Sequence, residues 1–166
     1  MSGARRLLLA GGIALAVWGM GYGLWYAVFA EHQALEEIGA SLSTAFSGAA
    51  RRDAAHSEAA LLRYKESKFI YDRQVDVHSH WIGLAMVLIA LGLCFDKVSF
   101  SEKTKLWLAF GFLAGAWLFP LGVLFQAYDR GQLPRILAIS GSALEIASLC
   151  LITFGLARVQ SSGSRS

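Results

Sequence analysis

The stretch VDVHSHWIGLAMVLIALGLCF, residues 75–95, decides the fold of this chain. Its strictly apolar part, residues 81–95, is too short to cross a hydrocarbon layer, which takes about 20 helical residues. A membrane span here must therefore include residues 76–80. It carries His78 and His80 into the headgroup region or the edge of the hydrocarbon core, where they could bind a ligand, handle protons or simply be interfacial polar groups.

The composition of the whole chain is also apolar. Of 166 residues, 55% are hydrophobic and 16% are charged, which is too apolar for one soluble domain. Segments of spanning length lie at residues 7–30, 76–95, 105–126 and 134–157. We therefore expect an all-α integral membrane protein with four transmembrane helices. The first segment also resembles a signal peptide, but its apolar run exceeds the usual h-region of about 7–15 residues, which favours an uncleaved span.

Positive charges predict the topology, because Lys and Arg near a span tend to stay in the cytoplasm. They precede span one, fill the loop after span two and follow span four: Arg5, Arg6, Lys97, Lys103, Lys105, Arg158 and Arg165. Both termini are thus expected to be cytoplasmic, in the inner membrane if the source is a bacterium. This distribution also explains the net charge of +3 without a nucleic-acid partner. Aromatic residues near the outer boundary are expected to anchor the helices there: Tyr22, Trp25, Tyr26, Trp81 and Tyr128.

Residues 31–75 are expected to form an extracytoplasmic helical hairpin that follows the first span, residues 1–30. Apolar side chains recur there at helical spacing, with a break near Ser47 and Gly48: Leu35, Ile38, Leu42, Phe46, Ala49, then Ala55, Ala59 and Leu62. The charged run at residues 51–53 is the expected turn. These alanine-rich stripes bury little area, so the hairpin should be stabilised by a membrane protein partner or a second copy. Residues 76–158 hold spans two to four, and residues 159–166 are expected to be a disordered cytoplasmic tail.

Each span also has a face of small residues, which helices in lipid use for close packing. In spans one and three these faces are Gly12, Ala16, Gly19, Gly23, Tyr26 and Ala30, and Gly111, Gly115, Leu118, Gly122 and Gln126. In spans two and four they are Asp72, Asp76, Ser79, Gly83, Ala90 and Cys94, and Ala138, Gly141, Glu145, Ser148, Ile152 and Gly155. Glu145 is therefore predicted to face protein.

The histidines are candidate ligands with an unfavourable geometry. On a regular helix His78 and His80 lie about 200° apart, so they cannot bind one ion together. His80 lies at the edge of the small-residue face, whereas His78 points to lipid or to a partner. His32 also lies away from the small-residue face of span one. A haem b or copper site would need His80 with His78 or His32, and the sequence does not distinguish between these two cofactors. The alternative is an imidazole that binds backbone or headgroups.

Glu145 is the most informative single residue, because a carboxyl inside a span costs a few kcal/mol on insertion scales. One interpretation is a neutral carboxyl bonded to Ser142, Ser148 or a neighbouring helix. The other is proton handling, with Tyr26 or Gln126 bridging toward His80.

The His-x-His sequence in VHSHWIGL, residues 77–84, resembles the entrance helices of haem- and copper-binding respiratory membrane proteins. The resemblance implies a redox partnership, although the chain lacks the further histidines that those families place on other spans. The sequence has no phosphate loop, nucleotide fingerprint, CxxCH motif or Ser/His/Asp pattern, and we expect no catalysis by the chain alone. We predict an accessory or assembly subunit of a larger, respiratory or redox, membrane complex. The alternatives are a haem b or copper redox protein, and a sensor or proton-linked transport protein that uses Glu145.

Overall fold

The computed structural model describes residues 1–163, with side chains described up to Arg158. These residues contain no strand and five α-helices: α1 Gly3–Phe29, α2 Glu31–Ala50, α3 Ala54–Cys94, α4 Glu102–Phe125 and α5 Gln132–Gly163, with a short 3₁₀ turn, Phe95–Lys97, after α3. Four of the helices, α1, α3, α4 and α5, are long and apolar enough to span a membrane. The prediction of an all-α chain with four such helices is confirmed.

Capping residues define where three of the helices begin. The side chain of Ser2 accepts a hydrogen bond from the Arg5 N–H, Asp53 caps α3, and Ser101 caps α4. Since no proline interrupts residues 54–94, α3 continues as one helix through the segment that holds both histidines.

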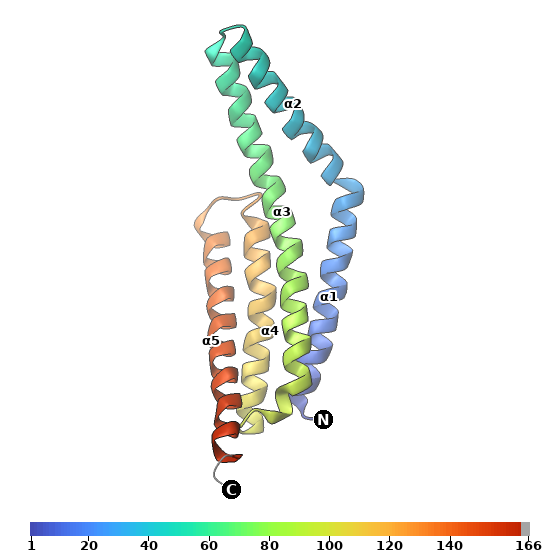
Figure 1. Cartoon of the computed structure of the whole chain (residues 1–166), viewed down its shortest axis with the longest axis vertical. Helices are drawn as coiled ribbons and strands as arrows, with labels where there is room; N and C mark the ends of the chain where they lie inside the picture. Colours follow the sequence, from blue (N-terminus) through green and yellow to red (C-terminus); the bar gives the residue numbers. More distant parts are fainter. Residues whose placement is uncertain (164–166) are drawn as a thin grey trace.

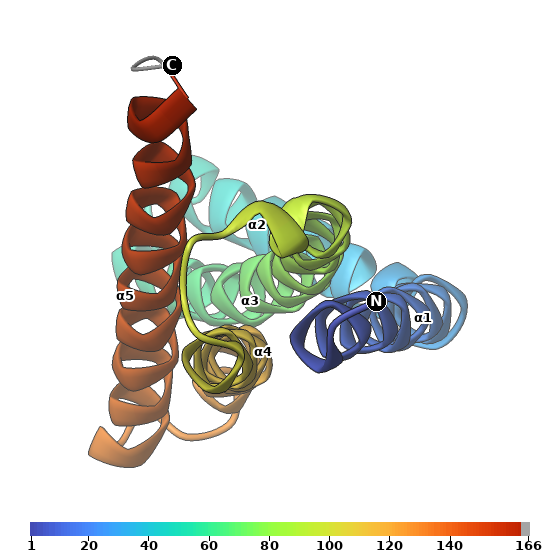
Figure 2. The same ribbon diagram turned by 90° about the horizontal axis from the view of Figure 1, so that it is seen from below.

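Helices α1, α3 and α4 pack around a common core, as the view along the helices shows (Figure 2). Fully buried side chains come from all three helices: Leu8, Leu15, Trp81, Leu88 and Phe112. The small residues that allow close approach to α3 come from α1. A Cβ on Gly12 would lie 3.0 Å from the Leu88 Cβ, and one on Gly19 would lie 3.0 Å from the Trp81 Cβ.

The small-residue face predicted for α3 is wrong, because the glycines of α1 allow large side chains of α3 to pack against it. Ser79, Gly83 and Ala90 are exposed, and a Cβ on Gly83 would have no neighbour within 4 Å. The face that packs is instead formed by Val77, Trp81, Ala85, Leu88 and Gly92. Gly12 and Gly19 of α1 make room for Leu88 and Trp81 of α3. Further along the same pair of helices, Gly92 of α3 makes room for Leu9 of α1.

Helix α5 packs against α4 through the small-residue stripe that the sequence predicts. All six predicted residues of α5 are buried: Ala138, Gly141, Glu145, Ser148, Ile152 and Gly155. Near its end α5 also meets the loop before α4, where the Ser99 N–H donates to the Gly155 carbonyl at 3.1 Å. Helix α5 contacts the other spanning helices mainly through α4, and its Ala138 and Ile152 belong to the same buried cluster (Figure 2). Of the four predicted spans, α1, α3 and α4 therefore contact one another, and α5 joins them through α4.

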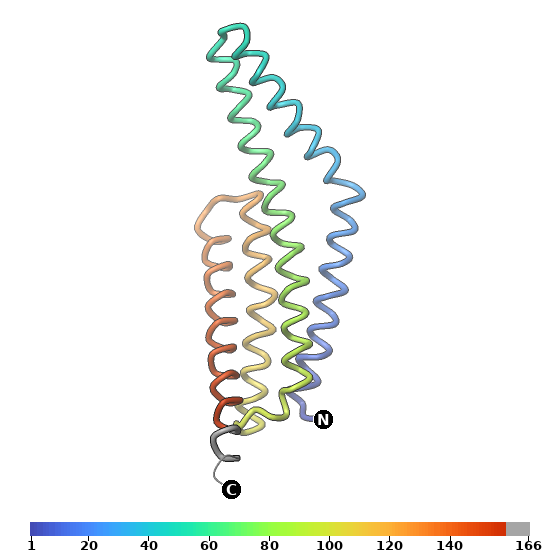
Figure 3. Tube along the Cα trace, in the orientation of Figure 1, coloured from blue at the N-terminus to red at the C-terminus, as the bar shows by residue number. Residues whose placement is uncertain are grey.

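Residues 31–75, here called the projecting arm, extend beyond the other helices (Figure 1). The chain reverses at residues 51–53, and α2 runs back beside the first half of α3 (Figure 3). Close approach at the reversal requires Gly48, where a Cβ would lie 2.9 Å from the Ser57 nitrogen. The Ser57 hydroxyl donates to the Ala45 carbonyl at 3.0 Å.

The packing faces predicted for the arm are also wrong. Small and polar residues make the contact between α2 and α3: Ser41, Ala45, Gly48, Ala60 and Ser67 are buried. The predicted stripes turn outward, and their exposed members are Leu35, Phe46, Ala49, Ala55, Ala59 and Leu62. Small residues let the two backbones approach closely, and the larger apolar side chains do not fit between them.

The N-terminus, the turn after α3 and the end of α5 lie at one end of the molecule, opposite the arm (Figure 1). At this end Arg5 and Ser2 both bond to Asp96, at 2.9 Å and 2.7 Å. Helix α5 continues to Gly163, so the predicted disordered tail, residues 159–166, is helical over residues 159–163. Its remaining residues, 164–166, lie outside the described part.

Candidate functional site

His78 packs against α1, which corrects the prediction that it faces lipid or a partner. Its Nδ1 lies 2.9 Å from the Gly19 carbonyl oxygen. A carbonyl can only accept a hydrogen bond, so Nδ1 carries the proton. The ring fills a notch at Gly23, where a Cβ would overlap the imidazole. His78 thus joins α3 to α1.

His80 points to a different neighbour. Its Nδ1 lies 2.5 Å from the carbonyl oxygen of Asp76, one turn earlier in α3. Its ring meets that of Phe119 of α4 edge-on, with centroids 4.7 Å apart. The Nδ1–H again donates to a backbone carbonyl, which leaves Nε2 as the nitrogen with a free lone pair.

The histidines therefore do not converge. His32 lies on α2 with 82% of its side chain exposed and pairs with Glu36 at 3.0 Å. Within the described residues, no group of three or more His, Cys, Asp and Glu side chains could hold a metal ion. A metal site made from His32, His78 and His80 within one chain has no support in this geometry.

Glu145 is buried between α5 and α4, with 7% of its surface exposed. Its Cγ would lie 2.8 Å from a Cβ on Gly115, so the glycine makes room for the carboxyl. Its Oε1 is buried and has no hydrogen-bond partner among the described residues. Of the two predicted serine neighbours, Ser148 is buried beside Gly111, while Ser142 lines a separate hollow with Phe119.

The two predicted bridging residues lie on other elements. Tyr26 of α1 is 7% exposed, and its hydroxyl has no partner in the described part of the chain. Its ring contacts that of Tyr71 of α3, with centroids 6.3 Å apart. Gln126 is half-buried directly after α4. No bond joins Tyr26 or Gln126 to Glu145 or His80 among the described residues.

A polar network that sequence reasoning missed joins three elements near the arm. The Tyr22 hydroxyl of α1 donates to the Gln74 side-chain oxygen, and the Gln74 amide donates to the Tyr128 hydroxyl at 3.2 Å. Gln74 is 5% exposed. The network ties α1, α3 and the loop after α4 together. Tyr22 and Tyr128 are predictable as interface anchors, but their partner Gln74 gives no signal in the sequence.

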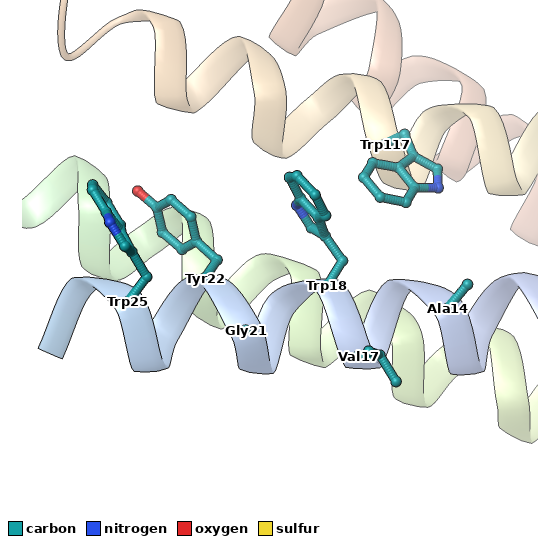
Figure 4. Close-up of a pocket in the computed structure, with 7 residues that line it drawn as sticks. All are labelled: Ala14, Val17, Trp18, Gly21, Tyr22, Trp25 and Trp117. Carbon is teal, nitrogen blue, oxygen red and sulfur yellow. The ribbon is translucent and has the colours of Figure 1, made fainter. Parts of the chain in front are cut away.

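Four of the five tryptophans lie beside this network. Trp18 contacts both Trp81 and Trp117, with centroids 5.9 Å and 5.7 Å apart, and Tyr22 contacts Trp81 at 5.1 Å and Trp25 at 5.9 Å. Figure 4 shows Trp18, Tyr22 and Trp25 along one side of α1, with Trp117 of α4 next to Trp18. They line a groove of about 610 Å³ between the two helices, here called the aromatic groove, whose base includes Ala14 and Gly21.

The comparisons with known proteins supply no relative for this chain. No protein-family model matches it, and it has no significant match among curated proteins or solved structures.

Proposed function

We propose that this chain is a non-catalytic accessory or assembly subunit of a larger membrane complex of the respiratory or redox type. The observation that carries the proposal is the outward apolar surface of the arm. Phe46 is 68% exposed and Leu62 is 66% exposed. Fully burying such a side chain contributes about 1.5–3 kcal/mol, so this surface favours association.

The placement of charge supports an extracytoplasmic arm. The start of α1 and the turn after α3, which carry Arg5 and Lys97, lie at the end of the molecule opposite the arm (Figure 1). Toward the arm, the positive side chains of Lys68, Arg73 and Arg130 are each paired with an acidic side chain. Positive residues near spans favour the cytoplasmic side. We therefore place both termini in the cytoplasm and the arm outside, as a helical hairpin that meets a partner.

The test is the size and composition of the particle extracted from native membranes in mild detergent. We expect a complex with at least one other membrane protein. Phe46→Ser and Leu62→Ser should each weaken it about tenfold or more, because each removes roughly 1.5–3 kcal/mol of apolar burial. Lys65→Ser is the matched control, because it changes an exposed polar position of the same arm. A wild-type chain that is extracted only as a monomer, or only with copies of itself, refutes the accessory role.

A second candidate, a haem b protein, is favoured by one observation. The Nδ1–H of His80 donates to a backbone carbonyl, which is how haem and metal ligands are commonly oriented, and Nε2 stays available. Since His78 and His32 point elsewhere, the second axial ligand would come from another chain. The purified protein should then show a Soret band that disappears in His80→Ala and persists in His32→Ala. A colourless protein from haem-replete cells removes this candidate.

A further inference from the structure

The aromatic groove lies between α1 and α4 in the half of α1 that leads into the arm. Trp18 and Trp25 are about half exposed, so the groove opens sideways rather than into the core. In a membrane such an opening faces lipid, and a ligand enters from the bilayer. The volume of about 610 Å³ is that of a typical small-molecule site, roughly 300–1,000 Å³.

The walls of the groove favour a flat ring. Trp18, Trp25 and Trp117 supply three indoles and Tyr22 a phenol. Aromatic faces carry negative charge density, most strongly in indole. They therefore stack best with an electron-poor ring. Gly21 adds space at the base, since a Cβ there would have no neighbour within 4 Å.

Three of the four polar side-chain groups at the groove are indole N–H donors without an acceptor among the described residues. None of the indole N–H groups of Trp18, Trp25 and Trp117 has an acceptor among the described residues. The Tyr22 hydroxyl already donates to Gln74. An indole nitrogen can only donate. A fitting ligand therefore supplies acceptor oxygens and needs no acceptor from the protein.

A second hollow along the same pair of helices provides room for an apolar tail. It measures about 390 Å³ and is lined by Leu7 of α1 and by Leu106, Trp107 and Phe110 of α4. Helices α1 and α4 meet between the two hollows, where a Cβ on Gly11 would lie 2.8 Å from the Leu113 methyl carbons. A long apolar chain would cross this contact on its outer, exposed side to reach the second hollow from the aromatic groove.

From these features we propose that the aromatic groove binds a membrane-soluble quinone. The electron-poor ring stacks on the indoles, its carbonyl oxygens accept from indole N–H groups, and its isoprenoid tail crosses the α1–α4 contact to the second hollow. This is a binding site only, and no electron transfer is assigned to it. It goes beyond the accessory role and requires only that the four helices lie in a membrane. Phospholipid ester carbonyls offer similar acceptors, but they lack the flat ring that the walls favour.

The test is tryptophan fluorescence of the protein in lipid nanodiscs, titrated with a ubiquinone analogue that carries a ten-carbon tail. Bound quinone quenches nearby indoles, so wild-type protein should show a saturable component above the linear quenching caused by partitioning. Gly21→Leu fills the groove and should weaken the saturable component about tenfold or more. Gly83→Leu is the matched control, because Gly83 is equally open, lies on α3 and lines neither hollow. It should bind as the wild type does.

Two further variants and a competition experiment make the result decisive. Trp25→Leu removes one wall and should also weaken binding, while Phe125→Leu, at a similarly exposed position of α4, should not. Circular dichroism verifies that each variant stays helical. Equal, linear quenching in all proteins overturns the proposal, because it reflects partitioning alone. Displacement by a short-chain phospholipid as effective as that by unlabelled quinone also overturns it, since the groove then binds lipid in general. Neither result bears on the partner that the arm is proposed to bind.

Discussion

Gly141 sets how closely α5 approaches α4, and its replacement by alanine should separate the two helices. The added methyl carbon would lie 2.8 Å from the Phe119 Cα and 2.9 Å from the Leu118 carbonyl carbon. Carbon atoms normally stay about 3.5–4.0 Å apart, so the helices must separate by roughly 1 Å. An extra methyl group in a packed core costs about 1–3 kcal/mol. We expect the upper end of that range, because the obstructing atoms are backbone and cannot rotate away.

The assay is reversible unfolding of purified protein in mixed micelles, followed by circular dichroism. Gly83→Ala is the matched control, because it makes the same change in a transmembrane helix with no atom within 4 Å of the new methyl. Gly141→Ala should be about 3 kcal/mol less stable than Gly83→Ala. If the two variants unfold together, the close α4–α5 packing described above is wrong.

Three further changes test the interior. Gly23→Ala should expel the His78 imidazole and lower stability by about 1 kcal/mol, since one hydrogen bond is lost; an unchanged ¹⁵N signal from the His78 ring would contradict this. Tyr22→Phe should cost about 1–3 kcal/mol in the same unfolding assay, because it removes a partner of buried Gln74, and a variant as stable as wild type would exclude the network. Glu145→Leu should favour membrane insertion of α5 by about 3 kcal/mol in a glycosylation-mapping assay; no change would mean that the carboxyl is not at membrane depth.

The spans were predictable because bilayer thickness fixes the length of apolar helix required. The packing face of α5 was predictable as well, because its stripe is small throughout and a carboxyl such as that of Glu145 is disfavoured in lipid. On this helix the sequence alone separates the buried side from the exposed one, and Glu145 is indeed 7% exposed.

The face of α3 was not predictable, because a helical wheel describes one helix at a time. Close packing needs small residues on only one partner, and Gly12 and Gly19 of α1 supply them. The bulky Trp81 of α3 could then become fully buried. The same limit explains the arm, where apolar Leu62 turns outward because the α2–α3 contact leaves room only for small side chains.

The aromatic groove could not be predicted from the sequence, because it depends on how the helices pack. Trp18, Tyr22 and Trp25 recur at helical spacing, so their common face on α1 is visible in the sequence. Nothing in the sequence aligns Trp117 with them, because periodicity within a helix carries no information on the register between helices. The resemblance around His80 led instead to the middle of α3, where the two histidines point to different neighbours.

Helix α5 presents an outward face on which a partner chain could pack. It packs on α4 and the loop before it, so most of its circumference faces outward, including Ile139 and Ile146. A carboxyl on a helix with one main neighbour has few donors within reach, and Glu145 Oε1 finds none among the described residues. Because this oxygen is buried where the side chain lies against Gly115 of α4, a donor from another chain cannot reach it, and a partner chain would pack on the outward face of α5 instead. Glu145→Leu should therefore favour insertion of α5 without weakening the complex that the arm is proposed to form.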